Sequence, residues 1–233
     1  DRIEAMFFDA NAIPRGKWVP GKDVGKLIKG GLRIPEAAYA PNIFGEEVDA
    51  TGLGSIKGDP DGHLVPVAGT LKPVPWLEGN VAQVLIEMTD AAGTTSVLSP
   101  RGILAKIVDH FAALGLRPVV ATELEFFLFE KSFDQIRKEK FRDLEPISGY
   151  NEDYHILQTT KEEHVMRPLR NHLWNAGIPV ENTKGEAEAG QEELNIKYAA
   201  ALDTADHHTI AKHATKEIAW QQGHAVTFLP KWH

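Results

Sequence analysis

The chain has 233 residues, a formal net charge of -8 and a hydrophobic content of 42%. This length allows one large or two modest domains with a packed core, and no apolar run reaches the roughly 20 residues that a membrane-spanning helix needs. The acidic balance argues against a nucleic-acid-binding protein, which needs a basic surface for phosphates. The absence of cysteine excludes disulfide bonds and thiolate metal ligands. Because the first residues also lack the layout of a signal peptide, we expect a soluble, cytoplasmic protein.

The first part of the chain predicts a small unit that is rich in strands. Three short apolar runs are interrupted by Gly, Pro and Asp, at residues 2–10, 63–71 and 80–98. The segment 21–62 favours loops, with its densest turn pattern at residues 49–62. Arg15, Gly16 and Lys17 follow a proline and predict a turn.

The pattern changes near residue 98, where we place a domain boundary. Ser99 suits a helix N-cap, Pro100 suits the first helical position, and Gly115 can end the helix. The remaining elements are predicted in this order: a strand at 117–129, a charged connector at 130–144, a helix at 161–176, a polar strand or ribbon at 185–198, a helix at 204–222 and a strand at 225–230. The segment Tyr150 to Leu157 favours a strand with one polar side.

Two carboxylates lie within the apolar strand VVATELEFFLFEK. Glu123 and Glu125 are two residues apart, so they point to the same face of a strand and lie about 7 Å from one another. Like charges placed in this way repel and raise each other's pKa unless a cation lies beside them. A solvated edge strand explains the pattern equally well at this stage.

A second acidic cluster occurs in KGEAEAGQEELNIKY. Glu186 and Glu193 are separated by an odd number of residues, so a regular strand would send them to opposite faces. Gly190 is the natural place for a bulge or turn that returns them to one side. Together with Glu123 and Glu125, these oxygen donors would suit a hard divalent cation such as Mg²⁺ or Mn²⁺. Taken alone, a solvated acidic hairpin carrying Glu186, Glu188, Glu192 and Glu193 is the favoured interpretation.

Read together and in order, these segments resemble the glutamine synthetase family, including its γ-glutamyl-amine ligase branch. The motifs that carry the resemblance are FFDANAIPRGKWVP, VLSPRGIL, ATELEFFLFE, YNEDYHIL, KGEAEAGQEELNIKY and TFLPKW. The first of them departs from the family pattern at Ala12, where the family has glycine. The resemblance implies an α+β protein with a β-grasp-like N-terminal domain at residues 1–97. Residues 98–233 would then form the first part of a glutamine synthetase-type α/β catalytic domain.

The resemblance also implies roles for individual residues. Glu125, Glu186 and Glu193 match the ligands of one divalent metal site, and Glu123 matches one ligand of a second. These ions, Mg²⁺ or Mn²⁺, would hold the phosphates of ATP as co-substrate. Asp49 falls in a loop that resembles the family segment reaching a neighbouring subunit's site, where an acidic residue binds and deprotonates the incoming amine. A ring-shaped homo-oligomer is therefore expected.

The implied reaction is the ATP-dependent ligation of ammonium or a small amine to the γ-carboxylate of glutamate, through γ-glutamyl phosphate. The chain ends before the family segments that carry the second site's histidine and the nucleotide- and glutamate-binding arginines. We therefore expect the N-terminal portion of a ligase, which would not catalyse the reaction alone. The alternative is a non-catalytic relative that binds a metal or a partner. Residues 51–73 resemble the amine-ligase branch more than the glutamine-forming one.

Overall fold

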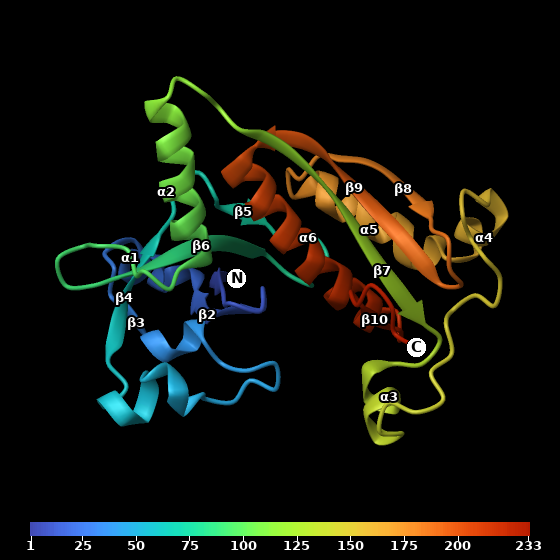
Figure 1. The fold of residues 1–233 in the computed structure, drawn as a ribbon, viewed down its shortest axis with the longest axis horizontal. Coiled ribbons are helices and arrows are strands. Elements are labelled where there is room, and N and C mark those ends of the chain that lie inside the picture. Colours follow the sequence, from blue (N-terminus) through green and yellow to red (C-terminus); the bar gives the residue numbers. More distant parts are fainter. The chain divides into compact units, whose positions relative to one another are not determined.

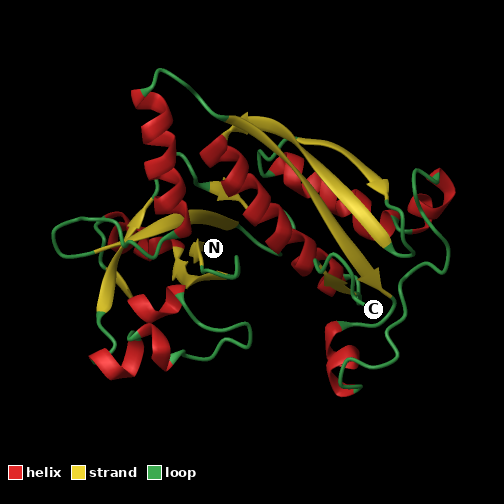
Figure 2. Ribbon diagram, viewed as in Figure 1, coloured by secondary structure: helices red, strands yellow, loops and turns green.

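The computed structural model describes all residues from Asp1 to His233. They divide into two compact units, residues 1–118 and residues 119–233. Each unit combines a sheet with helices (Figure 2), so the predicted mixed α and β class is correct. None of the helices is long and apolar enough to cross a membrane.

The first unit is built on a six-stranded sheet. Its strands are β1 (Arg2–Phe8), β2 (Pro14–Pro20), β3 (Leu32–Pro35), β4 (Asp61–Pro66), β5 (Lys72–Pro73) and β6 (Val81–Thr89). The order is β2-β1-β6-β4-β3, β5 pairs with β6, and the β1–β6 pair is parallel. Its α-helices are α1 (Val24–Ile28) and α2 (Pro100–Ala113). Ala5, Leu64 and Ile86 lie in the core of this sheet and pack in one buried cluster with Tyr39.

The turn between β1 and β2 lies within the motif FFDANAIPRGKWVP and is held by Asp9. The buried carboxylate of Asp9 accepts the backbone N–H groups of Asn11 and Ile13 at 2.8 and 2.9 Å, and the Arg15 guanidinium at 2.9 Å. Ala12 takes a left-handed backbone with φ of 55°, a conformation that favours glycine. The turn therefore precedes Arg15. The prediction of a turn at Arg15 to Lys17 is wrong, because these residues pair with β1 inside β2.

Helix α2 begins as its sequence predicts. The Ser99 hydroxyl accepts the Gly102 N–H at 2.9 Å, and Gly115 has φ of 73° beyond the last turn. Apolar side chains of this helix are open to solvent in this chain, since Ile103 and Phe111 are 51% and 39% exposed.

The second unit has an antiparallel sheet in the order β10-β7-β9-β8. Its strands are β7 (Val119–Phe129), β8 (Val180–Gly185), β9 (Gln191–Ala200) and β10 (Ala225–Thr227). Its helices are α3 (Phe133–Lys138), α4 (Ile156–Lys161), α5 (Glu163–Asn175) and α6 (Ala201–Gln221). Helices α5 and α6 lie together along one face of the sheet (Figure 1).

Several predicted elements of this unit need correction. The charged connector contains α3, which begins with a capping box between Ser132 and Gln135. The predicted polar ribbon is a hairpin of β8 and β9. The strand predicted at Tyr150 to Leu157 is absent, because this segment is a loop that leads into α4. An alternation of polar and apolar residues does not distinguish a strand from a loop whose polar groups form hydrogen bonds with nearby residues.

The sheet of the second unit has two different faces. One face, called the helix face here, carries Leu124, Phe126 and Leu194, all buried against α5 and α6. The other, called the glutamate face, carries Glu123, Glu125 and Glu193, because these residues alternate with the apolar ones. A single strand can carry both patterns since neighbouring side chains point in opposite directions.

Candidate metal centre

Strand β7 presents its two glutamates on the glutamate face, where both are exposed. The β7–β9 register places Glu125 opposite Glu193, and Glu123 opposite Asn195. Strand β10 pairs only with Phe127 to Phe129, so β7 has one neighbour at the level of Glu123 and Glu125. The exposure expected of an edge strand is therefore present, and the strand register places Glu125 beside Glu193 on the glutamate face.

The β8–β9 hairpin brings Glu186 to the same side. Glu186 follows the last residue of β8, and its N–H donates to the Gln191 carbonyl at 2.7 Å across the turn. Gly190 has φ of 70° in this turn, as the sequence predicts for a residue that reverses the chain. A side chain there would also place its Cβ 2.9 Å from the Leu128 carbonyl oxygen. The turn thus needs glycine for two reasons.

Lys184 joins the carboxylates of this face. Its ammonium donates to Glu186 and lies 3.3 Å from Glu193. The Gln191 amide donates to Glu125 at 2.8 Å, and the Asn195 amide donates to Glu193 at 2.7 Å. Each of the three glutamates therefore has a fixed orientation before any ligand arrives.

The electrostatics of the cluster reflect its burial and crowding. Burial raises the pKa of Glu193, and the neighbouring Glu186 carboxyl raises that pKa further. Burial also acts to raise the pKa of Glu186, but the hydrogen bonds of its carboxyl group with Lys184, Glu193 and the Ala187 N–H together outweigh burial and lower that pKa. Although burial disfavours the charged ammonium, contact with Glu186 raises the pKa of Lys184. A positive charge at this point is thus what the glutamates require.

The donor set fits a hard divalent cation. Three carboxylates come from three neighbouring positions on β7, the hairpin turn and β9, and all of their ligand atoms are oxygens. Such donors suit Mg²⁺, Mn²⁺ or Ca²⁺ rather than softer ions. The ammonium of Lys184 already compensates charge beside Glu186 and Glu193.

Asp49 is part of the first unit. It begins a short 3₁₀ turn, Asp49–Thr51, in the long loop between β3 and β4, and its side chain is exposed. The four glutamates belong to the second unit.

The sequence analysis missed a second carboxylate cluster, here called the buried triad. It consists of Glu152, Glu162 and Glu192, each of which offers an oxygen within 4.8 Å of those of the other two. Their side chains are 0%, 1% and 0% exposed. The interpretation of the acidic hairpin as solvated is therefore wrong for Glu192, and also for Glu193, which is 3% exposed.

A model of the family described as "Glutamine synthetase, catalytic domain" matches residues 97–233. The chain belongs to the glutamine synthetase family.

The glutamine synthetase relatives with known activities include several amine ligases. The chain is 37% identical over 163 residues to the γ-glutamylethanolamide synthetase GlnA4 of Streptomyces coelicolor. This alignment covers 70% of this chain and 35% of that protein. It is 33% identical over 235 residues to a glutamate–isopropylamine ligase from a Pseudomonas species, covering 99% of this chain and 50% of that protein. The chain thus spans half or less of the length of these two relatives.

Solved structures support the same fold. A structure described as a GmaS/ADP complex superposes with a TM-score of 0.80 at 22% identity, covering 99% of this chain and 49% of that one. A second, described as a novel glutamine synthase homolog, superposes with a TM-score of 0.81 at 19% identity over 98% of this chain and 51% of that one. At these identities the likeness concerns the glutamine synthetase-type fold.

Proposed function

We propose that the whole protein is an ATP-dependent ligase that joins a small amine or ammonium to the γ-carboxylate of glutamate. The observation that carries this proposal is the convergence of Glu125, Glu186 and Glu193 on the glutamate face, in a chain of the glutamine synthetase family. Carboxylates gathered in this way serve phosphoryl transfer, which depends on positioning and on offsetting charge.

Glu125, Glu186 and Glu193 would hold one divalent cation, Mg²⁺ or Mn²⁺, and Glu123 would contribute to a second site. When bound, such ions offset charge on the phosphates of ATP and orient them. The Gln191 and Asn195 amides keep the carboxylates of Glu125 and Glu193 pointing across the glutamate face. They act as positioning residues, because each reaches the site through the glutamate that it contacts.

The proposed chemistry has two balanced steps. An oxygen of the glutamate γ-carboxylate attacks the terminal phosphorus of ATP, and ADP leaves with the electron pair of the broken bond. The amine nitrogen then attacks the acyl carbon of γ-glutamyl phosphate, and phosphate leaves. A base must accept the proton of the ammonium, and a carboxylate close to it is suited to this role. We assign this role to the exposed Asp49, contributed to a neighbouring subunit in a ring-shaped homo-oligomer.

An amine larger than ammonium is the favoured acceptor. Two relatives exceed 30% identity. One is named for its product, γ-glutamylethanolamide, and the other for its substrate, isopropylamine. A γ-glutamylputrescine synthetase, PuuA of Escherichia coli, is 28% identical over 98% of this chain and 49% of its own length. Glutamine synthetases are 28% identical in Dictyostelium discoideum and 26% or 27% identical in Pyrococcus species, so the preference for an amine rests on the two relatives above 30% identity.

Two structural assignments belong to the same proposal. Residues 1–97 would form the β-grasp-like N-terminal domain, a description that the mixed sheet and its parallel β1–β6 pair support. Residues 98–233 would form the first part of the catalytic domain, a boundary that the start of the family match at residue 97 supports, although α2 lies within the first compact unit, residues 1–118.

Phosphate release from ATP by the whole protein tests the proposal. Glutamate is supplied with ammonium, methylamine, ethanolamine, isopropylamine or putrescine, in the presence of Mg²⁺ or Mn²⁺. We expect one amine to drive release and Glu125→Ala to abolish it, whereas Glu188→Ala, at an exposed carboxylate of the hairpin turn, should retain it. If no amine drives release while Mn²⁺ still binds to the glutamate face, the catalytic proposal is wrong.

A further inference from the structure

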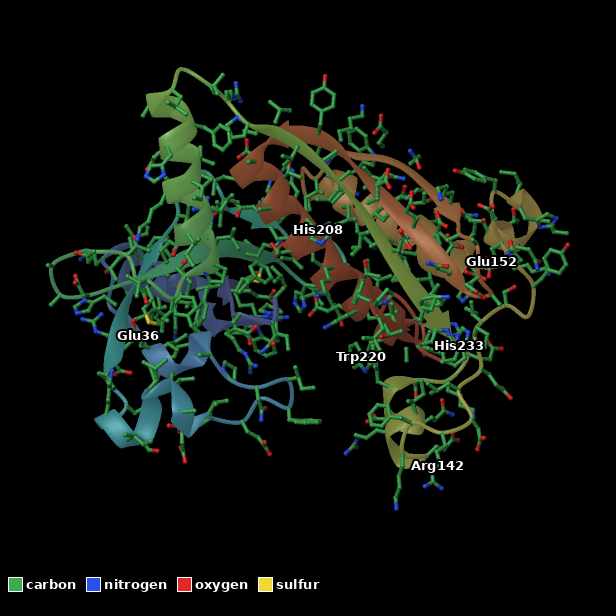
Figure 3. The ribbon with its side chains drawn as sticks, viewed as in Figure 1. Glu36, Arg142, Glu152, His208, Trp220 and His233 are labelled. Carbon is green, nitrogen blue, oxygen red and sulfur yellow. The ribbon has the colours of Figure 1, made fainter.

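The buried triad lies behind the hairpin that carries the candidate metal centre. Glu192 pairs with Phe126 and Gly185, so it points to the helix face, while the adjacent Glu193 points to the glutamate face. Glu162 precedes the first residue of α5, and Glu152 comes from the loop before α4 (Figure 3). Three separate segments therefore deliver one carboxylate each to the same enclosed point.

Almost all carboxylate oxygens of the buried triad lack a hydrogen-bond donor. Only one of the six oxygens has a hydrogen-bond partner, because Glu152 Oε1 accepts the Gly190 N–H at 2.7 Å. Both oxygens of Glu162 and both oxygens of Glu192 are buried without any partner. Burial of unpaired carboxylates is among the most costly arrangements in proteins, so something must neutralise them.

The nearby protein cation is engaged elsewhere. Arg170 acts to lower the pKa of Glu192, but its guanidinium donates to Glu163 at 2.6 and 2.8 Å and to Thr183 at 2.9 Å. No hydrogen bond or ion pair joins it to the triad. Without another positive charge, the carboxylates of Glu162 and Glu192 remain buried and unpaired.

The dimensions of the triad suit a single ion. Oxygen atoms on opposite sides of a hard divalent cation lie roughly 4.0–5.2 Å apart, twice a metal–oxygen distance of about 2.0–2.6 Å. The oxygens of the triad lie within 4.8 Å of one another. Because this chain already encloses the three side chains, a lysine or arginine from elsewhere would have to enter a closed site, whereas a bare ion needs much less room.

We propose that Glu152, Glu162 and Glu192 bind a hard divalent cation of the Mg²⁺, Mn²⁺ and Ca²⁺ class, at a structural site separate from the glutamate face. Its role is to fix the hairpin turn. Glu152 holds the N–H of Gly190, the residue whose left-handed backbone places Glu186 and Gln191. A cation on Glu152 therefore anchors the turn from the helix face and keeps the candidate catalytic glutamates in register.

Mn²⁺ binding to the whole protein tests this inference. The number of ions bound per chain is measured by equilibrium dialysis and elemental analysis after removal of metal with EDTA, together with the melting temperature. Glu162→Gln should bind one Mn²⁺ fewer per chain than the wild type and should lose part of the rise in melting temperature that Mn²⁺ causes. Glu188→Gln, which removes an exposed carboxylate from the same hairpin, should match the wild type in both.

The same Mn²⁺-binding experiment can also overturn the proposed site. If Glu162→Gln binds as many ions as the wild type and is at least as stable, protons rather than a cation neutralise the triad, and the inference is overturned. If this variant does not fold, anomalous diffraction from wild-type crystals grown with Mn²⁺ decides. A peak among the three carboxylates supports the site, and a peak on the glutamate face alone refutes it. Neither result depends on phosphate release, so failure of the ligase proposal is separately visible.

Discussion

Replacing Gly190 with alanine tests the hairpin turn that underlies both carboxylate clusters. Gly190 has φ of 70°, and its new Cβ would lie 2.8 Å from Pro146 Cβ and 2.9 Å from the Leu128 carbonyl oxygen. Leu128 cannot easily withdraw, because its N–H donates to the Gly190 carbonyl at 2.8 Å and its own carbonyl accepts Ile147 at 3.0 Å. The substitution therefore meets backbone that is hydrogen-bonded on both sides.

Three contributions set the change in the free energy of unfolding that Gly190→Ala causes. A left-handed backbone costs an alanine about 1–2 kcal/mol, and overpacking against fixed atoms costs about 1–3 kcal/mol. Alanine also restricts the unfolded chain, which offsets about 0.4–1 kcal/mol. We expect Gly190→Ala to lower the free energy of unfolding by about 3 kcal/mol and to weaken Mn²⁺ binding, because Glu186 and Gln191 flank the displaced turn.

Gly223→Ala is the matched control within the same unit. Gly223 has a similar φ of 83°, but its new Cβ would meet nothing within 4 Å. This variant should lose only the backbone contribution, about 1 kcal/mol or less, and keep its Mn²⁺ affinity. Chemical denaturation followed by circular dichroism, with Mn²⁺ titration, measures both quantities. Equal destabilisation by the two substitutions would refute the argument from the close contacts of Gly190.

Three further predictions concern other parts of the chain. Ala12→Gly should stabilise the first unit by about 0.5 kcal/mol. Relief of the strain that alanine has in the left-handed backbone at this position exceeds the conformational entropy that glycine adds to the unfolded chain. A lower melting temperature of the variant would contradict this. Ser99→Ala should cost about 1 kcal/mol because the Gly102 N–H loses its acceptor, and an unchanged denaturation midpoint would show that the cap contributes nothing. Burial acts to raise the pKa of Glu163, but its contacts with Arg170 and Arg167 together outweigh burial and hold that pKa below 4.5. Its ionised form therefore stabilises the fold at neutral pH, and this stabilisation is lost as the pH falls below 4.5. Glu163→Gln should therefore cost about 1 kcal/mol at pH 7 and nothing near pH 2, and a difference that does not change with pH would refute the linkage.

Elements with strong local determinants were predicted well. Ser99 and Pro100 located the start of α2, and the long apolar run located β7 within two residues of its observed start at Val119. These predictions succeed because capping and continuous hydrophobicity act over a few neighbouring residues. The prediction of a turn at Arg15 to Lys17 is wrong because the turn precedes β2. There the Asp9 carboxylate accepts hydrogen bonds from the backbone N–H groups of Asn11 and Ile13.

The amino-acid sequence alone determined which residues are chemically suited to hold a cation on the glutamate face, since alternation fixes the side of Glu123 and Glu125, and Gly190 permits the turn that returns Glu186. It also carried the resemblance to the glutamine synthetase family. The tertiary structure decided which acidic residues are buried. Glu152, Glu162 and Glu192 belong to a loop, a helix start and a strand, and only the packing of α5 against β8 and of α6 against β9 brings these segments together. No local pattern encodes such a meeting, because the cost of burying charge depends on every neighbour that excludes water.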